Sequence, residues 1–252
     1  TGDGSFENPY ATIGQALEVM NNGDFILVAP GTYQENLYSN GQSGSMLSFS
    51  GPDSTIIDGG GDGSCMVIEN APNSWLIGGF TFTNGYANEG GGIVARNSAG
   101  LILGGNRFIE NTAENVGGGV FALNTNTFVD SCIFISNSAN VYDGGGLMVI
   151  ADDSTGNRNV SINNSLFYQN SADEGAGIYL GAYNNTYMDA YMNNSHFVEN
   201  TGDHNVGLRV AGNVYCGVYG GIFAGNQAQA YAGAAGFSSY AYGWFNHSLF
   251  VG

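Results

Sequence analysis

Seven phenylalanines recur at nearly fixed intervals through the last two-thirds of the chain, and this repeat limits the possible folds more than any other feature. The intervals are 26, 26, 33, 30, 26 and 27 residues. The phenylalanines are Phe82, Phe108, Phe134, Phe167, Phe197, Phe223 and Phe250. A period of this length is typical of a solenoid, because one unit cannot bury its apolar face alone and must stack on its neighbours.

Each repeat contains two or three short apolar runs that turn-forming residues separate. One repeat has such runs at 119–123, 127–129 and 133–135, with glycine, asparagine, serine or aspartate near their ends. Runs of this length, rich in Val, Ile, Phe and Tyr, are typical of β-strands. Three strands and three turns make a coil that stacks on the next one in parallel at about 4.8 Å. The sequence therefore predicts an all-β, single-domain parallel β-solenoid of about nine coils.

Equivalent positions of successive coils form columns in such a stack. We expect the phenylalanines to stack inside the solenoid. From Phe108 to Phe223 each phenylalanine begins a Phe-x-x-Asn unit, and we expect these asparagines at a turn, in the left-handed conformation and bonded to the adjacent coil. Glycine clusters such as 90–92 and 117–119 follow the phenylalanines at one phase, with the single glycines Gly207 and Gly233 in the last repeats, and they predict positive φ at another corner.

The N-terminal segment has a different pattern. Residues 12–15, Thr-Ile-Gly-Gln, form a capping box, and residues 21–23, Asn-Asn-Gly, end the helix that it predicts. The apolar face of this helix comprises Ile13, Ala16, Leu17 and Met20. Such a helix covers the open end of a solenoid core. We therefore expect an N-terminal segment with a capping helix at 1–24 and β-helix repeats at 25–252, with the repeats able to continue beyond 252.

Two sets of residues resemble known proteins. Residues 8–13 (Asn-Pro-Tyr-Ala-Thr-Ile) and 23–33 (Gly-Asp-Phe-Ile-Leu-Val-Ala-Pro-Gly-Thr-Tyr) resemble the opening of right-handed parallel β-helix proteins of the pectate-lyase-like superfamily. The Phe-x-x-Asn and Gly-Gly-[Gly/Ala]-[Ile/Val/Leu] units are similar to the repeats of polymorphic outer-membrane proteins and related bacterial surface β-helices. The resemblance covers nearly the whole chain and implies a right-handed coil. It leaves function open, because the superfamily includes lyases, hydrolases, adhesins and passenger domains.

Composition excludes several classes of partner. The chain has 21 acidic residues, four arginines and no lysine, which gives a formal charge of −17. This charge repels nucleic-acid phosphates and anionic membrane surfaces. We therefore expect no nucleic-acid binding. No apolar run has membrane-spanning length, so we also expect no membrane insertion of this segment. The cysteines Cys65, Cys132 and Cys216 stand at different phases of the repeat, which predicts buried free thiols.

The residues that an enzyme of this superfamily needs are largely missing. Pectate-lyase-type chemistry requires a basic residue beside a uronate, usually with calcium, and polygalacturonase-type hydrolysis uses closely placed aspartates within family motifs. Asp152-Asp153 is the only similar pair, and its companion motifs are absent. Arg209 near Asp203, and Arg158 near Asp152 and Asp153, are the pairings available to an enzyme. Solvated turns are the other interpretation of these residues.

Some acidic side chains follow the repeat. Glu114, Asp173 and Asp203 each stand six residues after a phenylalanine of the repeat, and Asp173 and Asp203 are one coil apart. Like charges this close repel one another unless they are solvated or bridged by a hard cation. Calcium along this edge is therefore one hypothesis, and ordinary solvation is the other. No histidine cluster indicates zinc or another transition metal, so calcium is the only cofactor suggested.

Aromatic residues are concentrated in two segments, 183–191 and 231–244. The candidate ligand-binding or partner-binding residues are Tyr183, Tyr187, Tyr191, Tyr240, Tyr242 and Trp244. The last three alternate along the sequence, which places them on one face of a strand. If this face points outward, the rings are free to stack on sugars or on a partner chain. Packing inside the core is the other interpretation.

The regular repeat and the missing catalytic set favour a non-catalytic structural or adhesive protein, extracellular or at the cell surface. Residues 246–252 form another strand of the repeat without a recognisable cap, which leaves an edge able to pair with a following domain or a second copy. Self-assembly into filaments or a sheath is one version of this hypothesis, and binding of surface glycans is another. The alternatives are a polysaccharide lyase or glycoside hydrolase, or a carbohydrate-binding module on the same fold.

Overall fold

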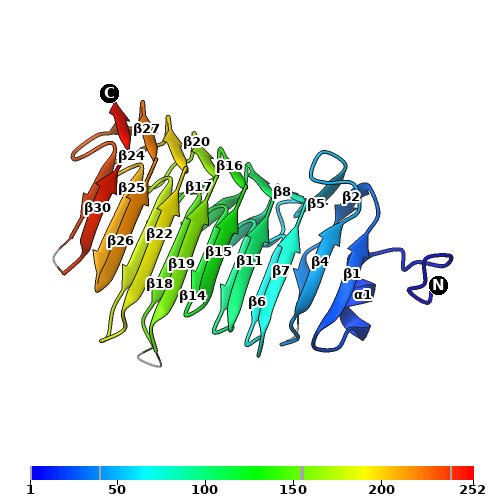
Figure 1. Ribbon diagram of the computed structural model, residues 1–252. Helices are drawn as coiled ribbons and strands as arrows, with labels where there is room; N and C mark the ends of the chain where they lie inside the picture. Colours follow the sequence, from blue (N-terminus) through cyan, green and yellow to red (C-terminus); the bar gives the residue numbers. More distant parts are fainter. Residues whose placement is uncertain (1, 40, 154–155, 239) are drawn as a thin grey trace.

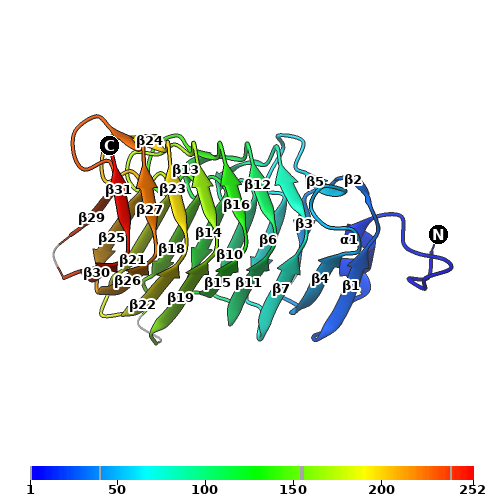
Figure 2. The same cartoon turned by 45° about the horizontal axis from the view of Figure 1, so that its top comes forward.

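The chain winds into a right-handed parallel β-solenoid with almost no helix, as the sequence predicts (Figure 1). This computed structural model describes residues 2–39, 41–153, 156–238 and 240–252. Three long sheets, A, B and C, run along the stack, with nine, nine and eight strands. Figure 2, in which the top comes forward, shows the strands of sheet B side by side from one end of the stack to the other.

Each coil contributes one strand to sheet A and one to sheet B, and every coil but the one with β30 and β31 also contributes one to sheet C. Sheet A contains β1 (Asp24–Val28), β4 (Gly44–Ser48), β7 (Ser74–Gly78), β11 (Gly100–Gly104), β15 (Asn126–Asp130), β19 (Arg158–Asn163), β22 (Met188–Asn193), β26 (Val214–Tyr219) and β30 (Tyr242–Asn246). Sheet B contains β2 (Gly31–Gln34), β5 (Thr55–Asp58), β8 (Thr81–Thr83), β12 (Arg107–Ile109), β16 (Ile133–Ile135), β20 (Leu166–Tyr168), β23 (His196–Val198), β27 (Ile222–Ala224) and β31 (Leu249–Val251). Sheet C contains β3 (Leu37–Tyr38), β6 (Met66–Glu69), β10 (Ile93–Arg96), β14 (Val120–Leu123), β18 (Leu147–Ala151), β21 (Ile178–Ala182), β25 (Leu208–Gly212) and β29 (Ala235–Phe237).

Two short sheets line the corner between sheets B and C. One contains β9 (Tyr86–Glu89), β13 (Thr112–Val116) and β17 (Ser138–Ala139), and the other contains β24 (Thr201–Gly202) and β28 (Gln227–Ala228). The two longest repeats place their extra residues at the opposite corner, before β19 and before β22. The corners therefore absorb the variation in repeat length, and the strands keep their register.

The phenylalanine column lies inside the solenoid, which confirms the prediction. Neighbouring rings from Phe82 to Phe250 are stacked, with centroids 4.6 to 5.3 Å apart. Those from Phe82 to Phe223 are at most 1% exposed. Each ring from Phe108 to Phe223 is removed from water and stacks on the rings of both adjacent coils. This column fixes the register of sheet B.

The asparagines of the Phe-x-x-Asn units do not adopt the left-handed conformation, so this prediction is wrong. The left-handed residue is the one before each asparagine, as at Glu110, Ser136 and Gln169 with φ near +55°. Asn111 and Asn137 are instead fully buried, and Asn111 Nδ2 donates to Asn137 Oδ1 at 3.0 Å. The turn at the preceding residue directs each amide inward, where it links adjacent coils.

The predictions for the glycine corners, the N-terminal helix and the cysteines agree with the structure. The first glycine of each cluster, as at Gly90 and Gly117, has positive φ. Helix α1 (Ile13–Val19) is capped by Thr12, whose hydroxyl accepts from the Gln15 amide at 3.2 Å. The three cysteines are free and buried, and burial raises the pKa of each thiol to about 12. No helix in the described part of the chain combines the length and apolar character that crossing a membrane requires.

Candidate functional site

The outer face of sheet A carries a group of neighbouring aromatic side chains that are exposed or half-buried. In β26 the even-numbered residues Val214, Cys216 and Val218 point into the core, so Tyr215 and Tyr219 point outward. The neighbouring strand β22 has the same alternation, and the register of β30 with β26 places Tyr242 and Trp244 on the outward face. All three strands lie together at the left of Figure 1. Their parallel register brings outward residues from different strands side by side.

Five outward aromatic residues of these strands form what we call the aromatic platform. It consists of Tyr191, Tyr215, Tyr219, Tyr242 and Trp244. The Trp244 ring centroid lies 4.7 Å from that of Tyr215, 6.2 Å from that of Tyr219 and 6.4 Å from that of Tyr191. The Trp244 Nε1 group donates to the Tyr219 hydroxyl at 2.9 Å. Tyr191, Tyr215 and Tyr242 are 42%, 47% and 70% exposed, so the platform presents its rings to solvent.

Gly217 lets the Trp244 ring rest on the sheet. Gly217 pairs with Tyr191 on one side and Trp244 on the other. A Cβ atom at position 217 would lie 2.6 Å from Trp244 Cζ2, well inside van der Waals contact. The ring therefore covers the position where a side chain would stand. Gly217 is therefore needed to leave room for the tryptophan ring. It is not needed for its backbone conformation, because its φ is not in the left-handed region.

Polar side chains border the platform on both sides. In one row Asn159 and Asp189 precede Tyr215 and Tyr242, and all four are exposed. The other row contains Asn163, Asn193, Tyr219 and Asn246. The Asn193 Nδ2 group donates to Asn163 Oδ1 at 2.8 Å, which holds the two amides in place. The site is thus a group of aromatic rings, inclined at 60° to 83° around Trp244, between two rows of hydrogen-bonding groups.

The structure places the sequence-predicted aromatic candidates in three different locations. Tyr191, Tyr242 and Trp244 belong to the platform. Tyr183 is at the corner before β22, where its hydroxyl lies 2.7 Å from that of Tyr179, and Tyr187 immediately precedes that strand. Tyr240 has φ of +73° and precedes β30, so it does not share a strand face with Tyr242 and Trp244. The predicted alternation therefore holds for two of the three residues.

The Asp152-Asp153 pair lies at the corner between β18 and β19, where both carboxylates have local partners. Asp152 Oδ1 accepts from Asn124 Nδ2 at 3.0 Å, and Asp153 Oδ2 lies 2.6 Å from a guanidinium nitrogen of Arg158. Asn124, Asp153 and Arg158 help to line a polar pocket of about 270 Å³ beside this corner. These contacts give both aspartates a structural role in holding the corner.

Of the two pairings available to an enzyme, Arg158 with Asp153 is present, whereas Arg209 does not pair with Asp203. Its Nε group donates to Glu174 Oε2 at 2.5 Å. Asp143 is beside Glu174, since its Oδ1 atom accepts from the Glu174 amide at 3.3 Å. Burial, and secondarily the Glu174 carboxylate, raise the pKa of Asp143 to about 6. This group covers the outer face of sheet C, where Tyr179 is 7% exposed.

The raised pKa of Asp143 predicts that the fold becomes more stable in mild acid. Its pKa is about 6 in the folded state and about 3.9 in an unfolded chain. The folded state therefore binds this proton more tightly, and its contribution to stability grows as pH falls from about 7 to about 4. We expect Asp143→Asn, which keeps the acceptor for the Glu174 amide, to raise the free energy of unfolding at neutral pH. The expected gain is about 1 kcal/mol after allowance for solvent screening.

Urea unfolding at several pH values tests this prediction. The stability of Asp143→Asn relative to the parent chain should be greatest near pH 7 and should vanish near pH 4. Asp62→Asn, at an exposed residue of an early coil, supplies the same charge change away from the cluster. Parallel pH profiles for the parent chain and Asp143→Asn would contradict the assignment.

The proposed calcium edge is divided in the structure. Asp173, Asp203 and His204 place one possible ligand atom each within 4.8 Å of one another, and His204 Nδ1 lies 3.3 Å from Asp173 Oδ1. Glu114 is in β13, where its carboxylate accepts from the Tyr86 hydroxyl at 2.9 Å. Glu114 is therefore separate from the other two acidic residues. Calcium binding at Asp173 and Asp203 stays a prediction, which the dependence of the melting temperature on calcium would test.

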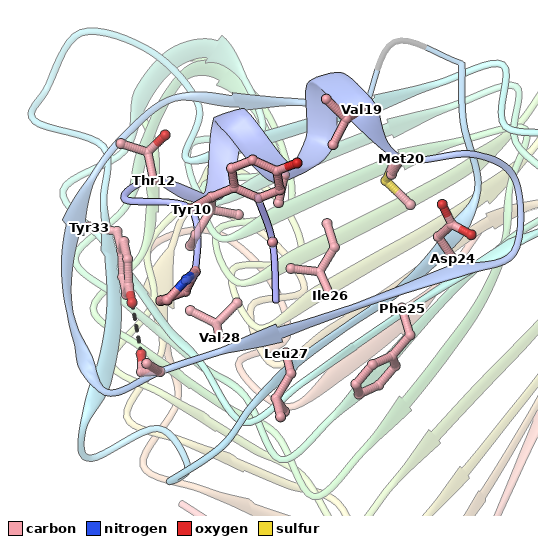
Figure 3. Close-up of a pocket in the computed structure, with 15 residues that line it drawn as sticks. Tyr10, Thr12, Val19, Met20, Asp24, Phe25, Ile26, Leu27, Val28 and Tyr33 are labelled. Carbon is pink, nitrogen blue, oxygen red and sulfur yellow. Dashed lines mark hydrogen bonds between the residues drawn. The ribbon is translucent and has the colours of Figure 1, made fainter. Parts of the chain in front are cut away.

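A pocket of about 500 Å³ lies at the N-terminal end of the solenoid (Figure 3). Side chains of α1 and β1 line it, among them Met20, Phe25, Ile26 and Val28. The Tyr33 hydroxyl donates to the Ala29 carbonyl oxygen at 2.9 Å beside it. Because Met20 and Val28 belong to the main core, we interpret this pocket as the partly covered end of the solenoid interior.

Two sets of residues were not predicted from the sequence, although the sequence carries a signal for each. Tyr215 and Tyr219 lie one repeat, about 27 residues, before Tyr242 and Asn246. Subtracting this period from the outward positions of one strand therefore gives the outward positions of the strand before it. Asp143 and Glu174 each immediately precede a glycine cluster, and the register makes such positions neighbours. In both cases the signal is the phase within the repeat rather than a local motif.

No protein-family model and no curated protein matches the chain. Among solved structures, carrot pectin methylesterase is similar over 93% of this chain and 86% of its own, with 14% identity and a TM-score of 0.48. Pectin methylesterase from Yersinia enterocolitica is similar over 96% of this chain and 90% of its own, with 11% identity and a TM-score of 0.45. We draw no functional conclusion from either similarity.

Proposed function

We propose that this protein is a non-catalytic, glycan-binding β-solenoid that acts outside the cell or at its surface, and that the aromatic platform is its binding site. The observation that carries the proposal is the Trp244 ring lying over Gly217, with tyrosines around it. A pyranose ring has a face of C–H groups and a rim of hydroxyls. The flat Trp244 ring suits the face, the tyrosines inclined around it contact the edges of the sugar, and the bordering amides and carboxylate suit the rim.

A glycan suits this surface better than an apolar protein partner does. Interfaces between proteins usually surround their aromatic residues with further apolar side chains. The platform instead has Asn159 and Asp189 on one side and asparagines on the other. Amides offer both donors and acceptors, so Asn159, Asn163 and Asn193 are able to serve sugar hydroxyls in either role. The rigid sheet also holds the rings in place before binding, which lowers the entropy cost of association.

An enzymatic function has less support because three of the four candidate catalytic residues have structural partners. Arg209 is paired with Glu174, Asp153 is paired with Arg158, and Asp152 is bonded to Asn124. General acid–base catalysis requires such groups to be available to a substrate. The platform, in contrast, exposes Tyr191, Tyr215 and Tyr242 to solvent.

Replacing Trp244 by alanine tests the proposed function. We expect the affinity for a binding oligosaccharide to fall at least about 30-fold, since an aromatic residue at the centre of a site typically contributes about 2 kcal/mol or more. Calorimetric titration with soluble cello- and chito-oligosaccharides measures the change.

Phe25→Ala is the matched control, because Phe25 is an exposed aromatic residue on the same sheet at the far end of the solenoid. Its affinity should equal that of the parent chain. Equal losses in the two variants, or binding that survives in Trp244→Ala, would show that the platform is not the site.

A further inference from the structure

The charges around the aromatic platform indicate which class of glycan it takes. Among the outward-facing residues of β19, β22, β26 and β30, all within the described ranges, Asp189 is the one carboxylate. None of these outward positions holds a lysine, arginine or histidine. The fixed charge at the platform is therefore negative, and it is supplied by a single exposed side chain.

Asp189 lies at the edge of the rings. It pairs in register with Tyr215, and it stands two residues before Tyr191 on the same face of β22. Directly opposed residues on neighbouring strands have Cβ atoms about 5 Å apart. A cation bound by this carboxylate would therefore also lie close to aromatic side chains. Carboxylate and ring attract a cation together, as in known sites for ammonium ligands.

The arginines of the chain are occupied elsewhere. Each of the four forms an ion pair with an acidic side chain: Arg96 with Glu69 and Glu89, Arg107 with Asp53, Arg158 with Asp153, and Arg209 with Glu174. With no lysine and a formal charge of −17, the molecule has a negative field that repels uronates and sulfated sugars. The same field attracts a positively charged polymer.

From these three observations we infer that the platform binds a glycan with free amino groups, a hexosamine polymer, in preference to neutral or acidic glycans. The inference rests on the proposed function. A sugar ring stacks on Trp244, with the inclined Tyr215 ring at its edge, and the ammonium group of the same or the adjacent sugar lies at the Asp189 carboxylate. Trp244 then supplies affinity for any suitable sugar, and Asp189 supplies the preference for the amine.

Four soluble oligosaccharides of equal length separate affinity from preference: β-1,4-linked glucosamine, N-acetylglucosamine, glucose, and an α-1,4-linked galacturonate. Titrations are made at low salt and mildly acidic pH, where the sugar amine carries its proton. We expect the glucosamine oligomer to bind about fivefold more tightly than its acetylated form, and the galacturonate to bind most weakly. Added salt should reduce the preference.

The variant Asp189→Asn should lose this preference and keep its affinity for the acetylated and neutral oligomers. Asp62→Asn changes the net charge equally at an exposed position of an early coil, and it should keep the preference. Equal binding of the amine and its acetylated form, or identical results for the two variants, would overturn the inference. Absence of binding to any of the four oligomers, or no effect of Trp244→Ala, would instead contradict the proposed function.

Discussion

Replacing Asn137 by alanine should lower the free energy of unfolding by about 4 kcal/mol. The side chain is completely buried and links three coils. Its Oδ1 atom accepts from the backbone amide and the Nδ2 group of Asn111, and its Nδ2 group donates to the Phe108 carbonyl and Asn170 Oδ1. Each group left buried without a partner costs about 1–3 kcal/mol, and the loss spreads along a connected column.

Urea unfolding, followed by circular dichroism, measures the change. Asn115→Ala is the control, because the Asn115 side chain donates to Asn88 Oδ1 in a solvent-exposed hydrogen bond. Its free energy of unfolding should stay within about 0.5 kcal/mol of the parent value. Similar small effects of both substitutions would show that the buried asparagine column contributes little to the association of coils.

Replacing Phe134 by alanine should have an effect of the same size, about 4 kcal/mol, for a different reason. Its ring is fully buried, with centroids 4.7 Å from Phe108 and 4.6 Å from Phe167. Removing it leaves a cavity between two rings that the strands of adjacent coils hold apart, so the site is poorly able to collapse. The same unfolding experiment measures the loss.

Phe49→Ala provides the comparison for this substitution, since Phe49 is 67% exposed at the end of β4. Its effect should be within about 0.5 kcal/mol. If the Phe134 variant lost no more than the Phe49 variant, the stacked column would not be the main apolar support of these coils.

The period of the repeat made the solenoid, its phenylalanine column and its glycine corners predictable. A single residue type at a fixed phase admits few interpretations when the residue is large and apolar, as at Phe108 and Phe134. Asparagine admits two, because it tolerates the left-handed conformation and also forms buried ladders of amides. The sequence does not distinguish them locally. The left-handed turn falls on residues such as Glu110 and Gln169, which have no strong preference for it.

The candidate site was predictable in part. Alternation placed Tyr242 and Trp244 on one face, and the structure places that face outward. Tyr215 and Tyr219 depend on the register between strands, which requires the exact number of residues in each corner. The importance of Gly217 was not predictable, because it arises only when a ring from the next strand lies on it.

Titration of tryptophan fluorescence with oligosaccharides tests the central claim most directly. The chain has two tryptophans, and Trp75 is fully buried with its Nε1 group bonded to the Gln42 carbonyl, so Trp244 is the one that a ligand on the platform contacts. We predict a saturable change in emission and protection from acrylamide quenching. Both should be lost or strongly reduced in Gly217→Ala, which displaces the ring without removing any aromatic residue. Emission that stays unchanged up to millimolar concentrations of neutral and amine-bearing oligosaccharides, in a folded chain, would contradict the account.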